Sequence, residues 1–198
     1  MSESCKSLLI AFLAWLLSWF LAFLYYNTGR TWMLSSLSYG YLLTVSFGVT
    51  KFYEKQSLTE RFGFQRKYWL VMFISICVGV VILYYFNLNL CDINVIEASF
   101  FAPFTEEVFF RGYMLGTFFK NPKNKLALFT WLILTSILFS LLHIFSFIYI
   151  YGNLILSRLL ITLTFGMVTG LIYIATKTIF LCFAFHMIVN ILILVVWY

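Results

Sequence analysis

The feature that most constrains this chain is a series of long apolar runs that contain almost no charged residues. A stretch of about 20 apolar residues can cross the hydrocarbon core of a bilayer as an α-helix. Seven stretches approach that length, at about 8–26, 33–50, 69–88, 99–119, 127–150, 157–175 and 178–197. The runs are continuous rather than alternating, which favours helices over the strands of a membrane barrel. We therefore predict an all-α, polytopic transmembrane helical bundle with about six to seven spans.

Composition excludes a water-soluble fold, because 63% of the residues are hydrophobic and only 10% are charged. Soluble domains are about half apolar and about a quarter charged. The segment at 33–50 is rich in Ser, Thr and Tyr and is the weakest of the seven. The four cysteines have no pairing rhythm and form no CxxC, so we expect neither a disulfide framework nor a zinc knuckle.

The net charge of +6 is explained by the position of the basic residues along the chain. If the N-terminus is cytoplasmic and all seven segments span, ten of the 13 basic residues face the cytoplasm: Lys6, Lys51, Lys55, Arg61, Arg66, Lys67, Lys120, Lys123, Lys125 and Lys177. Such a bias is the usual one for membrane proteins, so membrane lipid is an expected partner and nucleic acid is not. The polar stretch 51–67 is expected to be a cytoplasmic loop or an amphipathic helix on the anionic leaflet.

Several polar and ionisable residues nevertheless lie within the later predicted spans. A charged side chain at the centre of a bilayer costs roughly 2.5–3.5 kcal/mol on insertion scales, so such residues are rare and usually functional. Both histidines of the chain are among them. The set is Glu106, Glu107, Arg111, His143, His186 and Asn190.

Helical spacing places these residues in pairs, because side chains four residues apart lie on one helix face. Glu107 is therefore expected to pair with Arg111, which offsets part of the cost of burying both charges. The same spacing relates Phe139 to His143, and His186 to Asn190.

Glu106 points about 100° away from Glu107 on a helix of 3.6 residues per turn, so it is not the natural partner of Arg111. A buried carboxylate without a dedicated cation is suited to act as a general base. Pro103 fits the first turn of a helix, which would place both glutamates near its positive end.

Depth brings the polar residues together. Glu106, His143 and Asn190 each lie about seven residues from the same membrane face, roughly 10 Å at 1.5 Å per residue. His186 lies one turn deeper. We therefore expect three helices to converge on one pocket that is open to water at one end.

Each residue also has a purely structural interpretation. Glu107 and Arg111 alone could form a structural ion pair. His143 could bond to a neighbouring backbone carbonyl, and Asn190 could hold two helices together. None of these interpretations accounts for all six polar residues at once.

At these residues the chain resembles the CAAX-protease and bacteriocin-processing (CPBP, or Abi) family of intramembrane endopeptidases. That family carries the motifs EExxxR, FxxxH and HxxxN. They read here as EEVFFR at 106–111, FSLLH at 139–143 and HMIVN at 186–190. The order and approximate spacing match, and the resemblance covers roughly residues 100–195.

The resemblance implies an endopeptidase that cleaves a membrane-associated peptide or protein. Glu106, assisted by His143, would activate a water molecule for attack on the scissile carbonyl. His186 and Asn190 would stabilise the developing oxyanion.

Glu107, Arg111 and Phe139 would support the shape of the site. The chain has no HExxH motif, and Arg111 would place positive charge near any cation, so we favour a mechanism without a metal cofactor. Zinc is not excluded. If a metal is bound, its expected ligands are Glu106, His143 and His186.

Nearly all the polar residues within predicted spans lie after about residue 95, so we divide the chain there. Residues 1–95 are expected to hold the N-terminal spans and the basic loop, and residues 96–198 a CPBP-like catalytic membrane core. Short loops suit a bacterial member, for which the resemblance implies the cell membrane and a role in bacteriocin immunity, peptide maturation or signalling. Two other functions stay open, namely a non-catalytic bacteriocin-immunity protein and a proton-coupled transporter.

Overall fold

The computed structural model describes residues 3–28, 31–118, 125–151 and 154–197. Its long helices are α1 (Glu3–Thr28), α2 (Thr31–Gly48), α4 (Arg66–Tyr85), α8 (Lys125–Leu142), α10 (Ile155–Thr176) and α11 (Ile179–Trp197). The shorter ones include α3 (Leu58–Phe62), α9 (Ile144–Tyr151) and the π-helix η1 (Val49–Tyr53). No strand occurs in these four stretches, which confirms the predicted all-α fold.

Among the described residues, five helices are long and apolar enough to cross a membrane. They are Lys6–Leu24 within α1, α4, α8, α10, and Ile179–Val196 within α11. They correspond to five of the seven predicted segments and confirm a polytopic bundle. The segments at 33–50 and 99–119 are helical but are not among the five. Both carry polar residues that face the protein interior, as described below.

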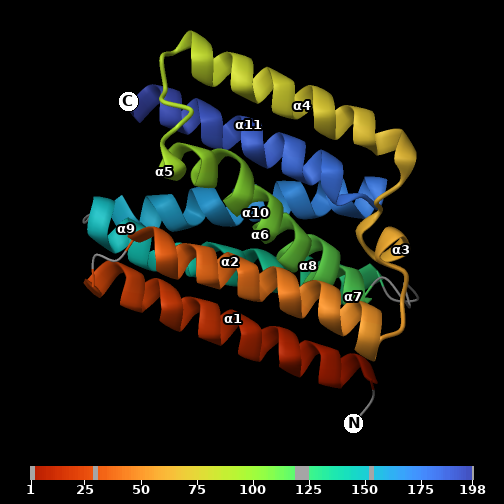
Figure 1. Ribbon diagram of the computed structural model, residues 1–198. Helices are drawn as coiled ribbons and strands as arrows, with labels where there is room; N and C mark the ends of the chain where they lie inside the picture. Colours follow the sequence, from red (N-terminus) through yellow and green to blue (C-terminus); the bar gives the residue numbers. More distant parts are fainter. Residues whose placement is uncertain (1–2, 29–30, 119–124, 152–153, 198) are drawn as a thin grey trace.

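The predicted segment at 99–119 belongs to a helical run that crosses the middle of the bundle (Figure 1). We call this run, from Ile93 to Phe118, the central helix. It consists of α5 (Ile93–Ile96), the π-helix η2 (Glu97–Phe101), α6 (Ala102–Glu107), the π-helix η3 (Val108–Leu115) and α7 (Gly116–Phe118). All eight residues of η3 are buried. A helix buried on every side has no face for lipid, so its charged residues are kept out of the hydrocarbon.

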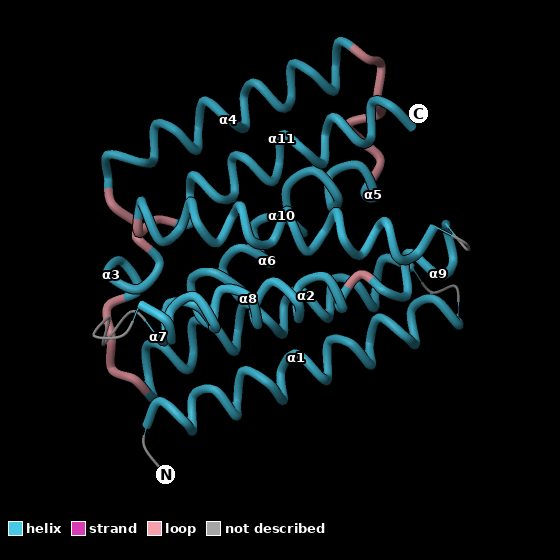
Figure 2. Tube along the Cα trace, turned by 180° about the vertical axis from the view of Figure 1, so that it is seen from behind, coloured by secondary structure: helices cyan, strands magenta, loops and turns pink. Residues whose placement is uncertain are grey.

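The other helices surround the central helix. α2, α8, α10 and α11 all contact it, with α1 packed along α2 and α4 along α11. Seen from behind, α10 lies between α11 and α8 (Figure 2). α10 can approach α8 closely because Gly170 has no side chain. A Cβ atom at that position would lie only 2.3 Å from Cδ1 of Leu132. Small residues at such positions are typical of packing between membrane helices.

Pro103 lies in the first turn of α6, but η2 leads directly into that turn. The positive end of the helical run is therefore at Ile93, and our expectation that it lies at the two glutamates was wrong. The N–H of Ala102 bonds to the carbonyl of Glu97, five residues back. In such a π-helical turn the next donor would be residue 103, and proline has no N–H. The carbonyl of Ala98 consequently has no donor of this kind within the helix.

The polar loop between α2 and α4 packs into the bundle, and its helix α3 is only five residues long. The side chain of Arg61 is buried, with the residue 6% exposed. Its guanidinium donates to the carbonyls of Gly116 (2.7 Å) and Tyr113 (3.3 Å) and pairs with Glu54 (3.2 Å). Burial lowers the pKa of Arg61, and the charge of Glu54 opposes that shift. Arg61 therefore caps the last turns of the central helix, where carbonyls lack helical donors. Of the two predicted forms of the stretch 51–67, the structure shows the loop, which holds the short helix α3, and its cytoplasmic position stays a prediction.

The same loop is fixed to the turn between α10 and α11. Tyr173 donates its hydroxyl to the carbonyl of Arg61 (2.7 Å), and Thr178 donates to the carbonyl of Gly63 (2.9 Å). Gly63 has a φ of 65°, and a Cβ atom there would lie 1.9 Å from the carbonyl oxygen of Lys177. Only glycine satisfies both conditions. The loop thus joins the end of the central helix to the start of α11.

Candidate active site

The predicted pair of Glu107 and Arg111 is present, with 3.2 Å between Oε2 and Nε. Both residues are buried, at 0% and 2% exposure. Arg111 also donates from Nη2 to the carbonyl of Gly166 (3.1 Å) and to the hydroxyl of Thr169, both on α10. The guanidinium carbon lies 4.6 Å from the centre of the Phe139 ring, a favourable cation–π distance. α6, α8 and α10 therefore all hold this one cation in place.

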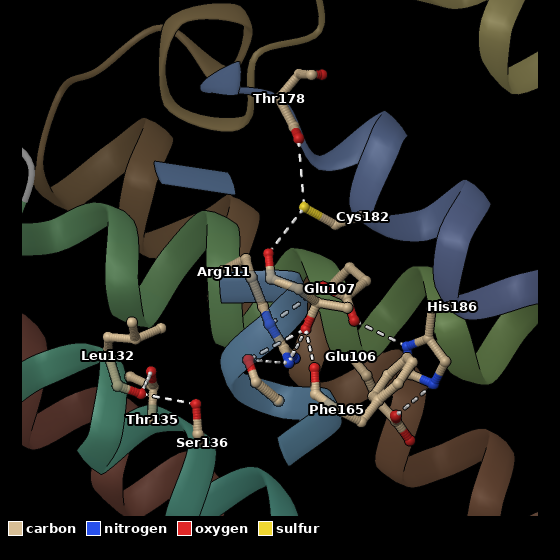
Figure 3. A network of polar contacts seen from close by, with 12 residues as sticks. Glu106, Glu107, Arg111, Leu132, Thr135, Ser136, Phe165, Thr178, Cys182 and His186 are labelled. Carbon is tan, nitrogen blue, oxygen red and sulfur yellow. Dashed lines mark hydrogen bonds and ion pairs between the residues drawn. The ribbon is translucent and has the colours of Figure 1, made fainter. Parts of the chain in front are cut away.

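The other oxygen of Glu107 binds His186, with 2.8 Å between Oε1 and Nδ1 (Figure 3). Because a carboxylate accepts hydrogen bonds, the imidazole carries a proton on Nδ1. This contact turns Nε2 of His186 toward Glu106, 3.7 Å from Oε2. Glu107 thus connects Arg111 to His186 and fixes the orientation of the ring, as carboxylates commonly do for functional histidines.

His143 is oriented in a similar way by a backbone carbonyl. Its Nδ1 lies 3.0 Å from the carbonyl oxygen of Phe139. A carbonyl can only accept, so Nδ1 carries the proton and Nε2 is directed to Glu106, 3.8 Å from Oε1. These two roles of Phe139, its ring on Arg111 and its carbonyl on His143, explain the spacing of the FxxxH pattern.

Glu106 therefore lies between two imidazole nitrogens. The separations of 3.7 and 3.8 Å are too long for direct hydrogen bonds. A water molecule or substrate atom that bonds to both members of such a pair would lie beside the line that joins them, and not between them. Glu106 is itself buried, at 4% exposure.

Asn190 donates from Nδ2 to the carbonyl of Ala98, at 2.9 Å. That carbonyl is the one left without a helical donor because of Pro103. Asn190 thus fixes α11 to the central helix with one of its two amide hydrogens. Its second amide hydrogen and its oxygen are not used in this bond.

A cavity of about 270 Å³ lies against this group of residues. It is lined by Glu106 of α6, by Asn190 of α11 and by His143, which lies in the turn between α8 and α9. The predicted pocket shared by these three residues is therefore present. His186 contacts Glu106 from the protein side and is not part of the lining, in agreement with its predicted position one turn deeper.

The structural interpretations of the motif residues are also realised. The ion pair, the bond from His143 to a carbonyl and the helix-joining bond of Asn190 all occur. The contact of His143 with the Phe139 carbonyl and that of His186 with Glu107 each use one ring nitrogen and direct the other to Glu106. These structural contacts are therefore compatible with a functional site at Glu106.

Five further residues line the cavity that the motif analysis did not select: Tyr39, Asn94, Glu97, Ala98 and Ala102. Four lining residues of the central helix, at 94, 98, 102 and 106, follow a spacing of four and lie along one face. That spacing could have identified Asn94 from the sequence. Tyr39, on α2, had no comparable signal beyond its position in a span rich in polar residues.

The described residues contain no group of three or more His, Cys, Asp or Glu side chains that could hold a metal ion. Glu106, His143 and His186 lie near one another, and His186 uses Nδ1 for Glu107 while its Nε2 is on the side of Glu106. The metal-free mechanism and the zinc alternative with these three residues as ligands both stay predictions.

The family model of the type II CAAX prenyl endopeptidases, Rce1-like, matches residues 69–192 of the chain. The chain belongs to this family. The match includes all three motifs and confirms the resemblance seen in the sequence. The protein is accordingly an integral membrane endopeptidase of the CAAX type, with a peptide or protein substrate. No curated protein and no solved structure matched the chain.

Proposed function

We propose that the protein hydrolyses a peptide bond in a membrane-associated substrate by means of a water molecule activated by Glu106. The observation that carries this proposal is the position of the Glu106 carboxylate, between two imidazole nitrogens and at the wall of the cavity. A general base must lie within hydrogen-bond reach of the water it activates. The spaces beside both carboxylate oxygens meet that condition.

In the proposed reaction, Glu106 takes a proton as the water oxygen bonds to the scissile carbonyl carbon. His143 helps to orient the water, because its Nε2 carries no proton and can accept a hydrogen bond from it. When the carbon–nitrogen bond breaks, Glu106 returns the proton to the leaving amine. The products are one new carboxyl group and one new amino group.

His186 and Asn190 stabilise the oxyanion of the tetrahedral intermediate. For this role His186 carries a proton on both nitrogens, so that Nδ1 donates to Glu107 and Nε2 to the oxyanion. Asn190 contributes the amide hydrogen that is not bonded to Ala98.

We further propose that the protein resides in a bacterial cell membrane, with the cavity open to the side away from the cytoplasm. Most of the described basic residues lie in segments at the end of the bundle that holds the N-terminus and α3, whereas Arg158 lies near the start of α10, at the end with α9 (Figure 1). The cavity is lined by Asn94 of α5 and by Asn190 in the C-terminal half of α11. α2 runs back along α1, as the charge analysis required. The positive-inside rule then places the α3 end in the cytoplasm.

The proposed location suits a role in peptide maturation or bacteriocin immunity, since both involve peptides at the outer surface of the cell. The alternatives are a non-catalytic immunity protein and a proton-coupled transporter. The match to an endopeptidase family supports the catalytic function over both.

The decisive experiment compares the wild-type protein with Glu106→Gln, purified in detergent and incubated with candidate membrane peptides. Loss of the general base should lower cleavage by about 10²–10⁴-fold. Glu60→Gln is the matched control, because it makes the same chemical change at an exposed position of α3. Its activity should equal that of the wild type.

Both proteins are also assayed with a chelator, which should leave cleavage unchanged. Loss of activity with the chelator, restored by added metal, would contradict the metal-free mechanism. If Glu106→Gln gave the wild-type phenotype in cells, catalysis would have to be abandoned for a binding or transport function.

A further inference from the structure

The imidazole of His186 carries one of the two nitrogens beside Glu106, but its bond to Glu107 does not fix the plane of the ring. That bond, 2.8 Å long, sets the position of Nδ1 only. The χ2 torsion of a histidine has broad minima, so the imidazole can still tilt. A tilt would move Nε2, which lies 3.7 Å from Oε2 of Glu106. The plane of the ring must therefore be held by other contacts.

Phe165 of α10 packs against the imidazole of His186 (Figure 3). The two ring centres are 4.7 Å apart, and the ring planes meet at 64°. Phe139 approaches the same imidazole more distantly, at 5.8 Å and 74°. Both are edge-to-face arrangements, which aromatic rings favour at such separations. The two phenyl rings thus restrict the tilt that the bond to Glu107 leaves open.

The backbone beside Phe165 is itself fixed to a motif residue. Arg111 donates hydrogen bonds to the Gly166 carbonyl and to the Thr169 hydroxyl. The same hydroxyl lies 3.1 Å from the carbonyl oxygen of Phe165. This turn of α10 therefore connects Arg111 to the ring that packs on His186. Phe165 lies outside the cavity lining, so its path to a bound substrate leads through His186.

We propose that Phe165 is a positioning residue, which holds the plane of the His186 imidazole so that Nε2 stays directed toward the reacting carbonyl oxygen. The inference rests on the proposed role of His186 in stabilising the oxyanion. A donor to an oxyanion is effective only when it already points to the place where the charge develops. The other ring on this imidazole, that of Phe139, also packs on Arg111, and its carbonyl holds His143. Phe165 is therefore the residue whose substitution isolates the contact.

The first test is the substitution Phe165→Leu, which removes the ring and keeps an apolar side chain. We expect kcat for peptide cleavage to fall roughly tenfold, near the upper end of what one edge-to-face contact contributes. KM should stay unchanged, because Phe165 does not line the cavity. Phe165→Tyr keeps the ring and should keep the wild-type kcat. The matched control is Phe73→Leu, the same change at a 65% exposed position of α4, which should leave kcat and KM unchanged.

A double-mutant cycle shows whether Phe165 acts through His186. His186→Ala alone should lower kcat by about 10²–10³-fold, the usual effect of removing one oxyanion donor. Adding Phe165→Leu to His186→Ala should lower kcat no further, since the ring then has no imidazole to hold. A wild-type kcat in Phe165→Leu, or an equal loss in Phe165→Tyr, would overturn the proposal. So would the same loss from Phe165→Leu with and without His186, because Phe165 would then act on the fold at large.

Nuclear magnetic resonance separates this inference from the proposed reaction, because it needs no cleavage. The chain has two histidines, so isotope-labelled histidine gives two imidazole signals, which His143→Gln assigns. The order parameter of each Cε1–H bond reports how far that ring moves. In micelles, Phe165→Leu should lower the order parameter of His186 and leave that of His143 unchanged. The rings that contact His143 are those of Phe139 and Phe147.

A lower order parameter at His186 alone would support the positioning role of Phe165 even if no peptide were cleaved. The same value in Phe165→Leu and in the wild type would refute the role, whatever the kinetic result. A loss of order at both histidines would also refute it, since the substitution would then have loosened the whole site.

Discussion

The ion pair of Glu107 and Arg111 gives a sharp test of how the site is held together. Glu107→Gln keeps the size of the side chain but leaves the buried guanidinium without its counter-charge. Removing one partner of a buried pair typically costs about 3–5 kcal/mol. Arg111→Met should cost a similar amount, because it leaves the Glu107 carboxylate buried at 0% exposure with only His186 beside it.

The double variant, Glu107→Gln with Arg111→Met, contains neither charge. Its free energy of unfolding should fall by only about 1–3 kcal/mol, because the Gly166 carbonyl and the Thr169 hydroxyl lose their donor. The double variant should therefore be more stable than either single variant. It should nevertheless stay inactive, because His186 loses the carboxylate that orients it.

The assay is unfolding in mixed micelles, with increasing SDS, followed by loss of helical circular dichroism. Free energies of unfolding for the wild type, both single variants and the double variant form a double-mutant cycle. If the double variant lost the sum of the two single losses, the charges would not be coupled. The reasoning from the buried pair would then be refuted.

Two further predictions concern the opposite end of the bundle and its orientation. Arg61→Met should lower the free energy of unfolding in the same assay by about 3 kcal/mol or more, because it removes the buried guanidinium that pairs with Glu54 and uncaps the central helix. Arg61→Lys should recover only part of the loss, since lysine cannot reproduce the fork of donors, and equal stability of all three proteins would contradict the capping role. Cys91, which is exposed near the start of the central helix, should react with an impermeant maleimide in intact cells when it is the sole cysteine. A sole cysteine placed by Glu60→Cys should react only after permeabilisation, and the reverse result would place the cavity on the cytoplasmic side.

The sequence predicted the parts of the site that depend on spacing along one helix. The pairing of Glu107 with Arg111 and the shared face of Phe139 and His143 follow from a four-residue interval, whatever the rest of the fold does. The meeting of Glu106, His143 and Asn190 followed from counting depth in alternating spans. Each of these inferences used only the regular geometry of a helix and the thickness of a bilayer.

The parts that were missed depend on contacts between distant segments or on irregular helix geometry. Arg61 was counted as one of many basic loop residues, because nothing in its local sequence shows that it turns back onto Gly116, 55 positions away. Tyr39 reaches the cavity only because α2 packs against the central helix. The early start of the central helix was missed because its π-helical turn places Pro103 inside a helical run, where a regular α-helix would disfavour it.

The adjacency of the two glutamates explains how one short helix serves both structure and chemistry. Neighbouring residues on a helix diverge by about 100°, so the two carboxylates point in different directions. Glu107 faces the interior, where it binds Arg111 and His186, while Glu106 faces the cavity and makes neither contact as a close bond. A spacing of three or four would have placed both carboxylates on one face, where they would compete for the same cation. The consecutive pair instead lets one glutamate neutralise the arginine and orient a histidine, and leaves the second at the cavity, where we propose that it activates a water molecule.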